Sequence, residues 1–138
     1  MSDLISKVKD LYAAFGRGDI ATILANVTDD VAWEYEAPAE IPVAGIRRGP
    51  KGATDFFSAH AAYSKDAKID ITEFLANENA VVGLGRYQAT ILPSNIRVDT
   101  PLAQYFQFRD GKVCRFAQFA NTAVIVEAVR GRAASATT

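Results

Sequence analysis

The spacing of apolar residues changes once along this chain, and that change restricts the folds open to it. In the first half, most apolar residues recur every three or four positions, the period of a helix with one buried face. From Lys68 onward they recur at every second position, the period of a strand. Helices that precede a run of strands predict an α+β fold, in which the helices pack on an antiparallel sheet.

Three helices are expected in the first half, at residues 4–15, 20–27 and 50–61. Gly16-Arg17-Gly18 ends the first helix, Asp19 is placed to cap the second, and Pro50 suits the first position of the third. A turn at Thr28-Asp29-Asp30 is expected to lead into a short strand at residues 31–36, where apolar and polar side chains alternate.

Four further strands are expected in the second half, at residues 68–76, 80–91, 96–108 and 112–120. The segments between them are rich in turn residues: Asn77-Glu78-Asn79, Pro93-Ser94-Asn95 and Asp110-Gly111. An antiparallel meander is the simplest way to join such strands. Residues 37–49, with two prolines and two glycines, are expected to form a loop, and Asn121 is placed to cap a short closing helix.

The composition fits one domain with its own core. The chain has 138 residues, 49% of them hydrophobic, and no repeat or linker divides it. We assign residues 1–130 to a single domain and expect residues 131–138, which are small and polar, to form a flexible tail.

Charge and residue counts argue against several classes of protein. The net charge is -1 without a run of Lys or Arg, so no nucleic-acid partner is expected. Cys114 and His60 are the only residues of their kinds, which leaves neither a disulfide nor a zinc cluster, and no cofactor is expected. No apolar stretch reaches the roughly 18 residues of a membrane span. With no signal peptide visible, these features predict a cytoplasmic protein without a membrane partner.

The order of elements, together with several short motifs, resembles the nuclear transport factor 2-like superfamily. The resemblance is to its polyketide-cyclase (SnoaL-like) and ketosteroid-isomerase-like branch, and it extends over roughly residues 3 to 129. The motifs are Gly18-Asp19, Asp29-Asp30-Val31-Ala32-Trp33-Glu34, Ile46-Arg47-Arg48-Gly49, Phe56-Phe57, Gly85-Arg86-Tyr87, Arg109-Asp110-Gly111-Lys112-Val113 and Asn121-Thr122-Ala123. The resemblance implies a cone, in which a curled sheet wraps around three N-terminal helices.

The resemblance also implies that the ionisable groups of several relatives are missing here. Ketosteroid isomerases carry their carboxylate base where this chain has Tyr35. Limonene-epoxide hydrolases carry an Arg and an Asp at the positions of Gly85 and Tyr87, and a catalytic Asp at that of Gln118. Gln104 stands where isomerases have a protonated acid and many SnoaL-like proteins a His. Side chains that are neutral at pH 7 therefore replace the usual carboxylates.

Strand alternation predicts which side chains face the interior of such a cone. The expected ligand-binding residues are mainly aromatic, and two of them, Tyr87 and Gln118, carry a polar group. The full set is Trp33, Phe56, Phe57, Tyr87, Phe106, Phe116 and Gln118. Such a pocket suits a small, neutral, mostly apolar molecule with a carbonyl or hydroxyl group. The alternative is that these aromatic residues only pack the core.

Three residues are candidates for catalysis. His60 could act as a general base with a pKa near 6.5, and Tyr35 and Gln104 could donate hydrogen bonds to an oxyanion. The alternative for His60 is a structural role on the buried face of its helix. Glu36 and Arg86 are expected to point away from the pocket; the alternative for Glu36 is that a bulge near Ala37-Pro38 turns it inward.

Two functions fit these residues. One is isomerase, cyclase or lyase chemistry on a neutral carbonyl compound, and the other is noncatalytic ligand binding by a dimeric accessory domain. Val82 and Leu84, which alternate with Gly83 and Gly85, make one strand apolar on both faces. Members of the superfamily commonly pair through this outer sheet surface, so a homodimer is expected.

Overall fold

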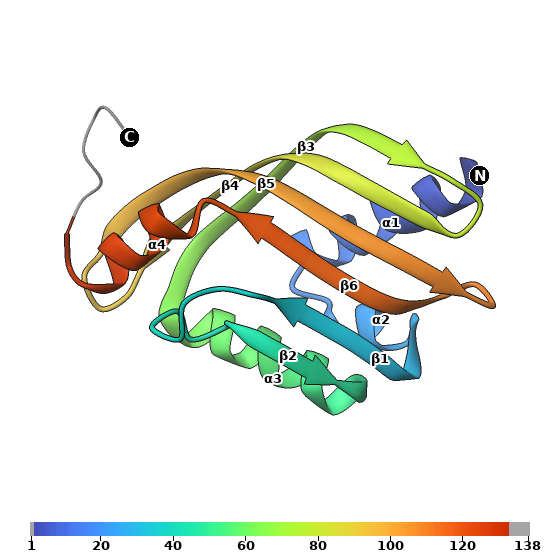
Figure 1. The fold of residues 1–138 in the computed structure, drawn as a ribbon, viewed down its shortest axis with the longest axis horizontal. Helices are drawn as coiled ribbons and strands as arrows, with labels where there is room; N and C mark the ends of the chain where they lie inside the picture. Colours follow the sequence, from blue (N-terminus) through green and yellow to red (C-terminus); the bar gives the residue numbers. More distant parts are fainter. Residues whose placement is uncertain (1, 133–138) are drawn as a thin grey trace.

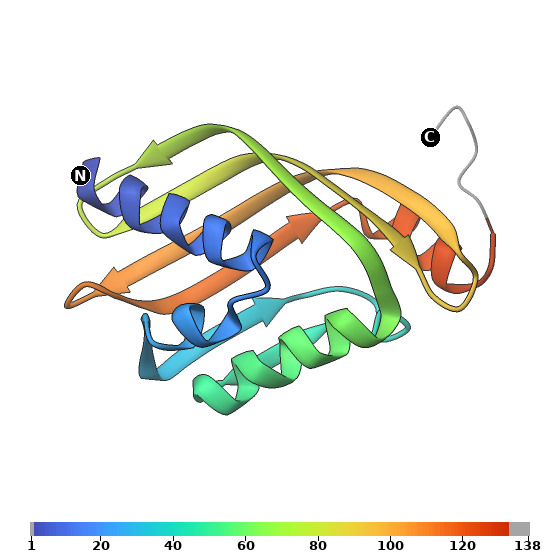
Figure 2. The ribbon, with the colours of Figure 1, turned by 180° about the vertical axis from the view of Figure 1, so that it is seen from behind.

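The computed structural model describes residues 2–132 and shows an α+β fold, as predicted. Helices α1 to α3 lie on one face of a curled sheet, and α4 lies at one end of it (Figures 1 and 2). The elements in chain order are α1 (Ser2–Gly16), α2 (Ile20–Leu24), β1 (Val27–Tyr35), β2 (Gly45–Arg48), α3 (Gly49–Tyr63), β3 (Ser64–Ala76), β4 (Ala80–Ile91), β5 (Ile96–Arg109), β6 (Lys112–Ala120) and α4 (Thr122–Val129).

The six strands form one sheet in the order β2-β1-β6-β5-β4-β3. Strands β3 to β6 form the predicted antiparallel meander, and β1 pairs in parallel with β6. Because residues paired across a sheet share a face, this register places Trp33, Phe116 and Phe106 side by side. The same face carries Val81, opposite Phe106. This is the inner face, against which the helices pack.

Four predicted boundaries were wrong, and each error has the same cause. Helix α2 ends at Leu24, three residues before the expected end, because Val27 belongs to β1 and pairs with β6. Thr28-Asp29-Asp30 belongs to β1, which starts at Val27 opposite Val113 of β6. Strand β2 forms inside the predicted loop because Gly45 to Arg48 pairs with the free edge of β1. Strand β3 starts at Ser64, four residues before Lys68, because β4 is long enough to pair with it. Partner strands supplied by distant sequence set these boundaries.

The two predicted helix caps behave differently. Asp19 accepts hydrogen bonds from the backbone nitrogen of Thr22 at 3.1 Å and from its hydroxyl at 2.6 Å, as expected for a capping side chain. Asn121 occupies the capping position of α4, but its side chain makes no capping bond. Its backbone N–H donates instead to Oγ1 of Thr100, at 2.9 Å.

Gly85 allows β3 and β4 to approach each other closely. An added Cβ at this position would lie 1.9 Å from the backbone oxygen of Asp70. The register of β3 shifts beside it, between Ile71 and Glu73. A contact with rigid backbone cannot be relieved by side-chain rotation, so this position requires glycine.

No helix in residues 2–132 is both long enough and apolar enough to cross a membrane.

Arg130, at the end of α4, forms an ion pair with Glu40 in the loop between β1 and β2. Residues 133–138, most of the predicted flexible tail, lie outside the described residues.

Candidate functional site

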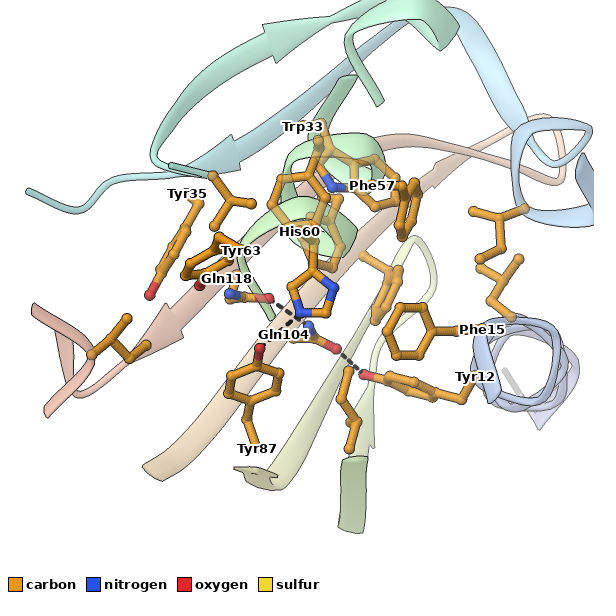
Figure 3. Close-up of a pocket in the computed structure, with 18 residues that line it drawn as sticks. Tyr12, Phe15, Trp33, Tyr35, Phe57, His60, Tyr63, Tyr87, Gln104 and Gln118 are labelled. Carbon is orange, nitrogen blue, oxygen red and sulfur yellow. Dashed lines mark hydrogen bonds between the residues drawn. The ribbon is translucent and has the colours of Figure 1, made fainter. Parts of the chain in front are cut away.

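A cavity of about 60 Å³ lies between the inner sheet face and helices α1 to α3 (Figure 3). The cavity is lined by Leu11, Tyr12, Phe15, Ile23, Trp33, Tyr35, Val43, Phe56, Phe57, His60, Tyr63, Ile69, Tyr87, Gln104, Phe106, Phe116, Gln118 and Ile125. This set includes every residue that the sequence placed in the site.

The aromatic residues line the cavity and also pack against one another. The rings of Trp33 and Phe116 are stacked, with centroids 4.2 Å apart. Phe106 meets Phe116 edge-on at 5.2 Å, and Phe56 and Phe57 both lie against Trp33. The same aromatic cluster therefore packs the core and forms one wall of the cavity.

A chain of neutral hydrogen bonds crosses the inner face. The hydroxyl of Tyr12 donates to Oε1 of Gln104 at 2.7 Å, and Nε2 of Gln104 donates to Oε1 of Gln118 at 2.8 Å. Figure 3 shows this chain running from α1 across the sheet. Gln104 therefore uses its oxygen and one N–H within the protein, while the amide nitrogen of Gln118 lies at the end of the chain.

His60 lies in the cavity, but its pKa differs from the expected value near 6.5. Burial lowers this pKa to about 4, because an imidazolium ion would lose its hydration without meeting a negative charge. His60 is therefore neutral at pH 7, and the expected titration between pH 5 and 8 was wrong.

The hydrogen bonds of His60 limit what it can do. Its Nε2 lies 2.7 Å from the Tyr87 hydroxyl and 3.3 Å from Oγ of Ser64. Ser64 also donates to the backbone oxygen of His60, at 2.6 Å. The 2.7 Å contact admits either tautomer of the ring. Only the tautomer with hydrogen on Nε2 leaves a free lone pair, on Nδ1, that could accept a proton.

The tyrosines of the cavity keep their protons. Burial raises the pKa of Tyr35 to about 12, against a smaller lowering effect of Gln118. Burial also raises the pKa of Tyr12, Tyr63 and Tyr87. Neither Tyr35 nor Tyr87 therefore ionises near pH 10, the ordinary value for a tyrosine. All four hydroxyls remain hydrogen-bond donors throughout the physiological range.

Two buried polar atoms have no hydrogen-bond partner among the described residues. They are Nε1 of Trp33 and the hydroxyl oxygen of Tyr35. The indole N–H can only donate, and an unpaired buried donor costs about 1 to 3 kcal/mol. Both residues line the cavity, but these two atoms are almost fully enclosed by protein.

Charged side chains lie outside the cavity. Among the described lining residues there is no Lys, Arg, Asp or Glu. Arg86 pairs with Asp99 at 2.8 Å on the outer face, and Glu36 is exposed, so both point away as expected. Within residues 2–132, no three His, Cys, Asp or Glu side chains gather in a way that could hold a metal ion.

The sequence analysis did not predict several of the residues that line the cavity. Tyr12 and Phe15 were read only as part of the apolar stripe of the first helix, and Val43 lies in the loop after β1. The helical stripe could have suggested Tyr12, because a tyrosine on a buried face needs a hydrogen-bond partner. Tyr63 ends α3 one turn after His60, on the same face.

A model of the SnoaL-like domain family matches residues 8–116. The chain belongs to this family. A search of curated proteins finds no significant relative. The fold of this SnoaL-like domain is that of nuclear transport factor 2-like proteins, as the sequence motifs suggested.

Solved structures share the fold of this SnoaL-like domain at low sequence identity. A nuclear transport factor 2-like protein from Burkholderia pseudomallei superposes with a TM-score of 0.87 at 21% identity, covering 94% of this chain and 98% of its own. TerC, crystallised with polyporic acid, gives 0.82 at 21% identity, with 91% and 97% covered. A ketosteroid isomerase-like protein from Catenulispora acidiphila, bound to trimethylamine, gives 0.66 at 13% identity, with 79% of each chain covered.

The low pKa of His60 makes the stability of the SnoaL-like domain depend on pH. Between pH 6.5 and 4 the unfolded chain binds a proton at His60 that the folded chain does not bind. We therefore expect the free energy of unfolding to fall by about 2 kcal/mol between pH 7 and pH 5 because of this residue. Urea unfolding at the two pH values would measure the change. His60 is the only histidine, so His60→Gln should remove most of it, and an unchanged slope in this variant would contradict the assignment.

Proposed function

We propose that this SnoaL-like domain binds a small, neutral, mostly apolar carbonyl compound. The observation that carries the proposal is a mainly apolar cavity whose described lining includes amides, hydroxyls and an imidazole but no charged side chain. A carboxylate or phosphate would lose its hydration there without gaining an ion pair. A hydrocarbon would give the hydroxyls and amides of the cavity no hydrogen-bond partner. A neutral molecule with an acceptor oxygen avoids both costs.

The second candidate function is isomerase, cyclase or lyase chemistry on the same class of compound. The observation in its favour is that His60 lies in the cavity and is unprotonated at pH 7. In this reaction Nδ1 would take a proton from the carbon next to the carbonyl, while a neighbouring donor stabilises the enolate oxygen. A pKa near 4 makes His60 a weak base, so binding without catalysis is the function that the geometry supports better.

We also propose that two copies of the chain pair through the outer sheet face. The exposed large apolar residues of the described chain are Ile46, Leu75 and Phe119. Cross-strand register puts Ile46 and Leu75 at the two ends of one outer row, with Glu34, Ala117, Tyr105 and Val82 between them. Phe119 belongs to the next outer row. Apolar side chains gathered on one sheet face favour a self-complementary contact.

Ligand charge provides the first test. Acetophenone and benzoate have nearly the same shape, but only benzoate is charged at pH 7. We expect acetophenone to bind at least about 100-fold more tightly, since burying an unpaired carboxylate costs several kcal/mol. The fluorescence of Trp33, the single tryptophan, reports binding directly because its ring lines the cavity.

Matched glutamine variants locate the effect. Gln118→Leu should weaken acetophenone binding about tenfold by removing an amide donor. Gln88→Leu should leave it unchanged, because Gln88 contacts Asp99 on the outer face. Tighter binding of benzoate than of acetophenone would show that a cation reaches the cavity and would overturn the proposal.

Proton exchange separates binding from catalysis. If His60 removes a proton from the bound ketone, the methyl protons of acetophenone should exchange with D2O faster in the presence of the protein. The rate should be constant above about pH 5.5 and fall as the pH approaches 4, where the imidazole becomes protonated. Proton NMR follows the loss of the methyl signal. His60→Gln should abolish the acceleration, and no acceleration by the natural protein would leave binding as the function.

The association state tests the outer face. We expect a dimer in light scattering at tens of micromolar, on the order of ordinary dimer affinities. Phe119→Lys should give monomers, because it places a charge in the apolar surface. Lys51→Ala, on the exposed side of α3, should remain dimeric. A monomeric natural protein at this concentration would rule out the proposed pairing.

A further inference from the structure

Tyr12 is the only polar residue through which α1 contacts the cavity. Of the lining residues on α1, Leu11 and Phe15 are apolar, whereas the hydroxyl of Tyr12 lies 2.7 Å from Oε1 of Gln104. Gln104 is almost fully buried, with 4% of its surface exposed, and lies in the middle of the sheet on β5. This buried hydrogen bond therefore joins α1 to the centre of the sheet, although the two residues are 92 positions apart in the sequence.

The ring of Tyr12 is held in place from two sides. Phe106 meets it edge-on with centroids 5.7 Å apart, and Phe74 packs against it at 6.3 Å. Gly83, which pairs with Gln104 across the sheet, leaves room for the hydroxyl. An added Cβ at Gly83 would lie 3.0 Å from the hydroxyl oxygen, closer than nearly all such contacts. The hydroxyl therefore fits a space that exists because residue 83 has no side chain.

The direction of the hydrogen bonds follows from the number of hydrogens. The Tyr12 hydroxyl has one hydrogen, and no other acceptor among the described residues bonds to it. If both amides were reversed, Gln104 would donate to Tyr12, whose hydrogen would then be buried without an acceptor, at a cost of about 1 to 3 kcal/mol. Burial also raises the pKa of Tyr12, so the hydrogen stays in place.

The chain of donors ends at Gln118. Because Gln104 donates to Oε1 of Gln118 at 2.8 Å, the amide nitrogen of Gln118 is turned away from Gln104. In Figure 3 it points toward the side of the cavity where Tyr35 and Tyr63 lie.

We propose that Tyr12 is a positioning residue that fixes the orientation of two amides, so that Gln118 presents N–H rather than C=O to the oxygen of a bound ligand. The inference rests on the proposed function, since it assumes a ligand with an acceptor oxygen. Without the hydroxyl, Gln104 and Gln118 can reverse together while keeping the bond between them. Gln118 would then present its oxygen, which repels a carbonyl ligand and leaves an apolar ligand unaffected.

The experiment compares acetophenone with ethylbenzene, which has the same ring and no oxygen. Tyr12→Phe removes the hydroxyl and keeps the ring contacts. We expect acetophenone binding to weaken about tenfold and ethylbenzene binding to change less than about twofold. Isotope-edited infrared spectroscopy of ¹³C-carbonyl acetophenone gives a second readout. The carbonyl stretch should lie at a lower frequency in the natural protein and move toward its value in alkane solvent in Tyr12→Phe.

Two further variants complete the design. Tyr105→Phe removes a tyrosine hydroxyl from the neighbouring position on β5, on the outer face, and should change neither ligand affinity nor frequency. Gly83→Ala keeps the Tyr12 hydroxyl but crowds it, so it should reduce the preference for acetophenone in the same direction as Tyr12→Phe. If Tyr12→Phe does not fold, Gly83→Ala decides the question, and an unchanged preference in that variant overturns the inference.

The outcomes distinguish the inference from the function on which it rests. If the natural protein shows no preference for acetophenone over ethylbenzene, the proposed function is wrong and the inference falls with it. If the preference exists and Tyr12→Phe retains it with the same carbonyl frequency, the function stands and the inference is wrong. Equal weakening of both ligands would show that Tyr12 only supports the fold, which also overturns the inference.

Discussion

The chemistry of the cavity depends on the burial of polar side chains without any charged partner. Desolvation lowers the pKa of His60 and raises that of Tyr35, so both remain neutral. Neutral groups can satisfy one another only through hydrogen bonds, which is why Gln104 and Gln118 form a directed chain. The weak basicity of the histidine and the pairing of the two amides both follow from this one condition.

The two faces of the sheet use polar residues in different ways. On the outer face, Arg115 pairs with Glu34 and Arg86 pairs with Asp99, where water shares the cost of solvating the charges. On the inner face the polar groups are amides and hydroxyls, which lose less solvation energy on burial than ions do. Strand alternation keeps these two sets apart, although their residues are adjacent in sequence. One strand can therefore contribute to a dry cavity and to a surface that carries ion pairs.

The sequence was sufficient for properties that depend on local periodicity. Alternation along β1 and β4 to β6 correctly placed Trp33 inside and Arg86 outside, because a strand has only two faces. The sequence was insufficient where a structure or a contact depends on a residue far away in the chain. Strand β2 forms only because β1 has a free edge, and the hydrogen-bonding role of Tyr12 depends on a glutamine 92 residues away. The error in the pKa of His60 has the same origin, since burial by other elements cannot be read from its helix alone.

Gly85 restricts how this site could change during evolution. Where limonene-epoxide hydrolases carry an arginine, this chain has a glycine whose added Cβ would meet the backbone of Asp70 at 1.9 Å. No single substitution at this position can introduce the arginine, because the shifted register of β3 would have to change first. The close pairing of β3 and β4 therefore excludes an arginine at this position for as long as the backbone keeps its present course.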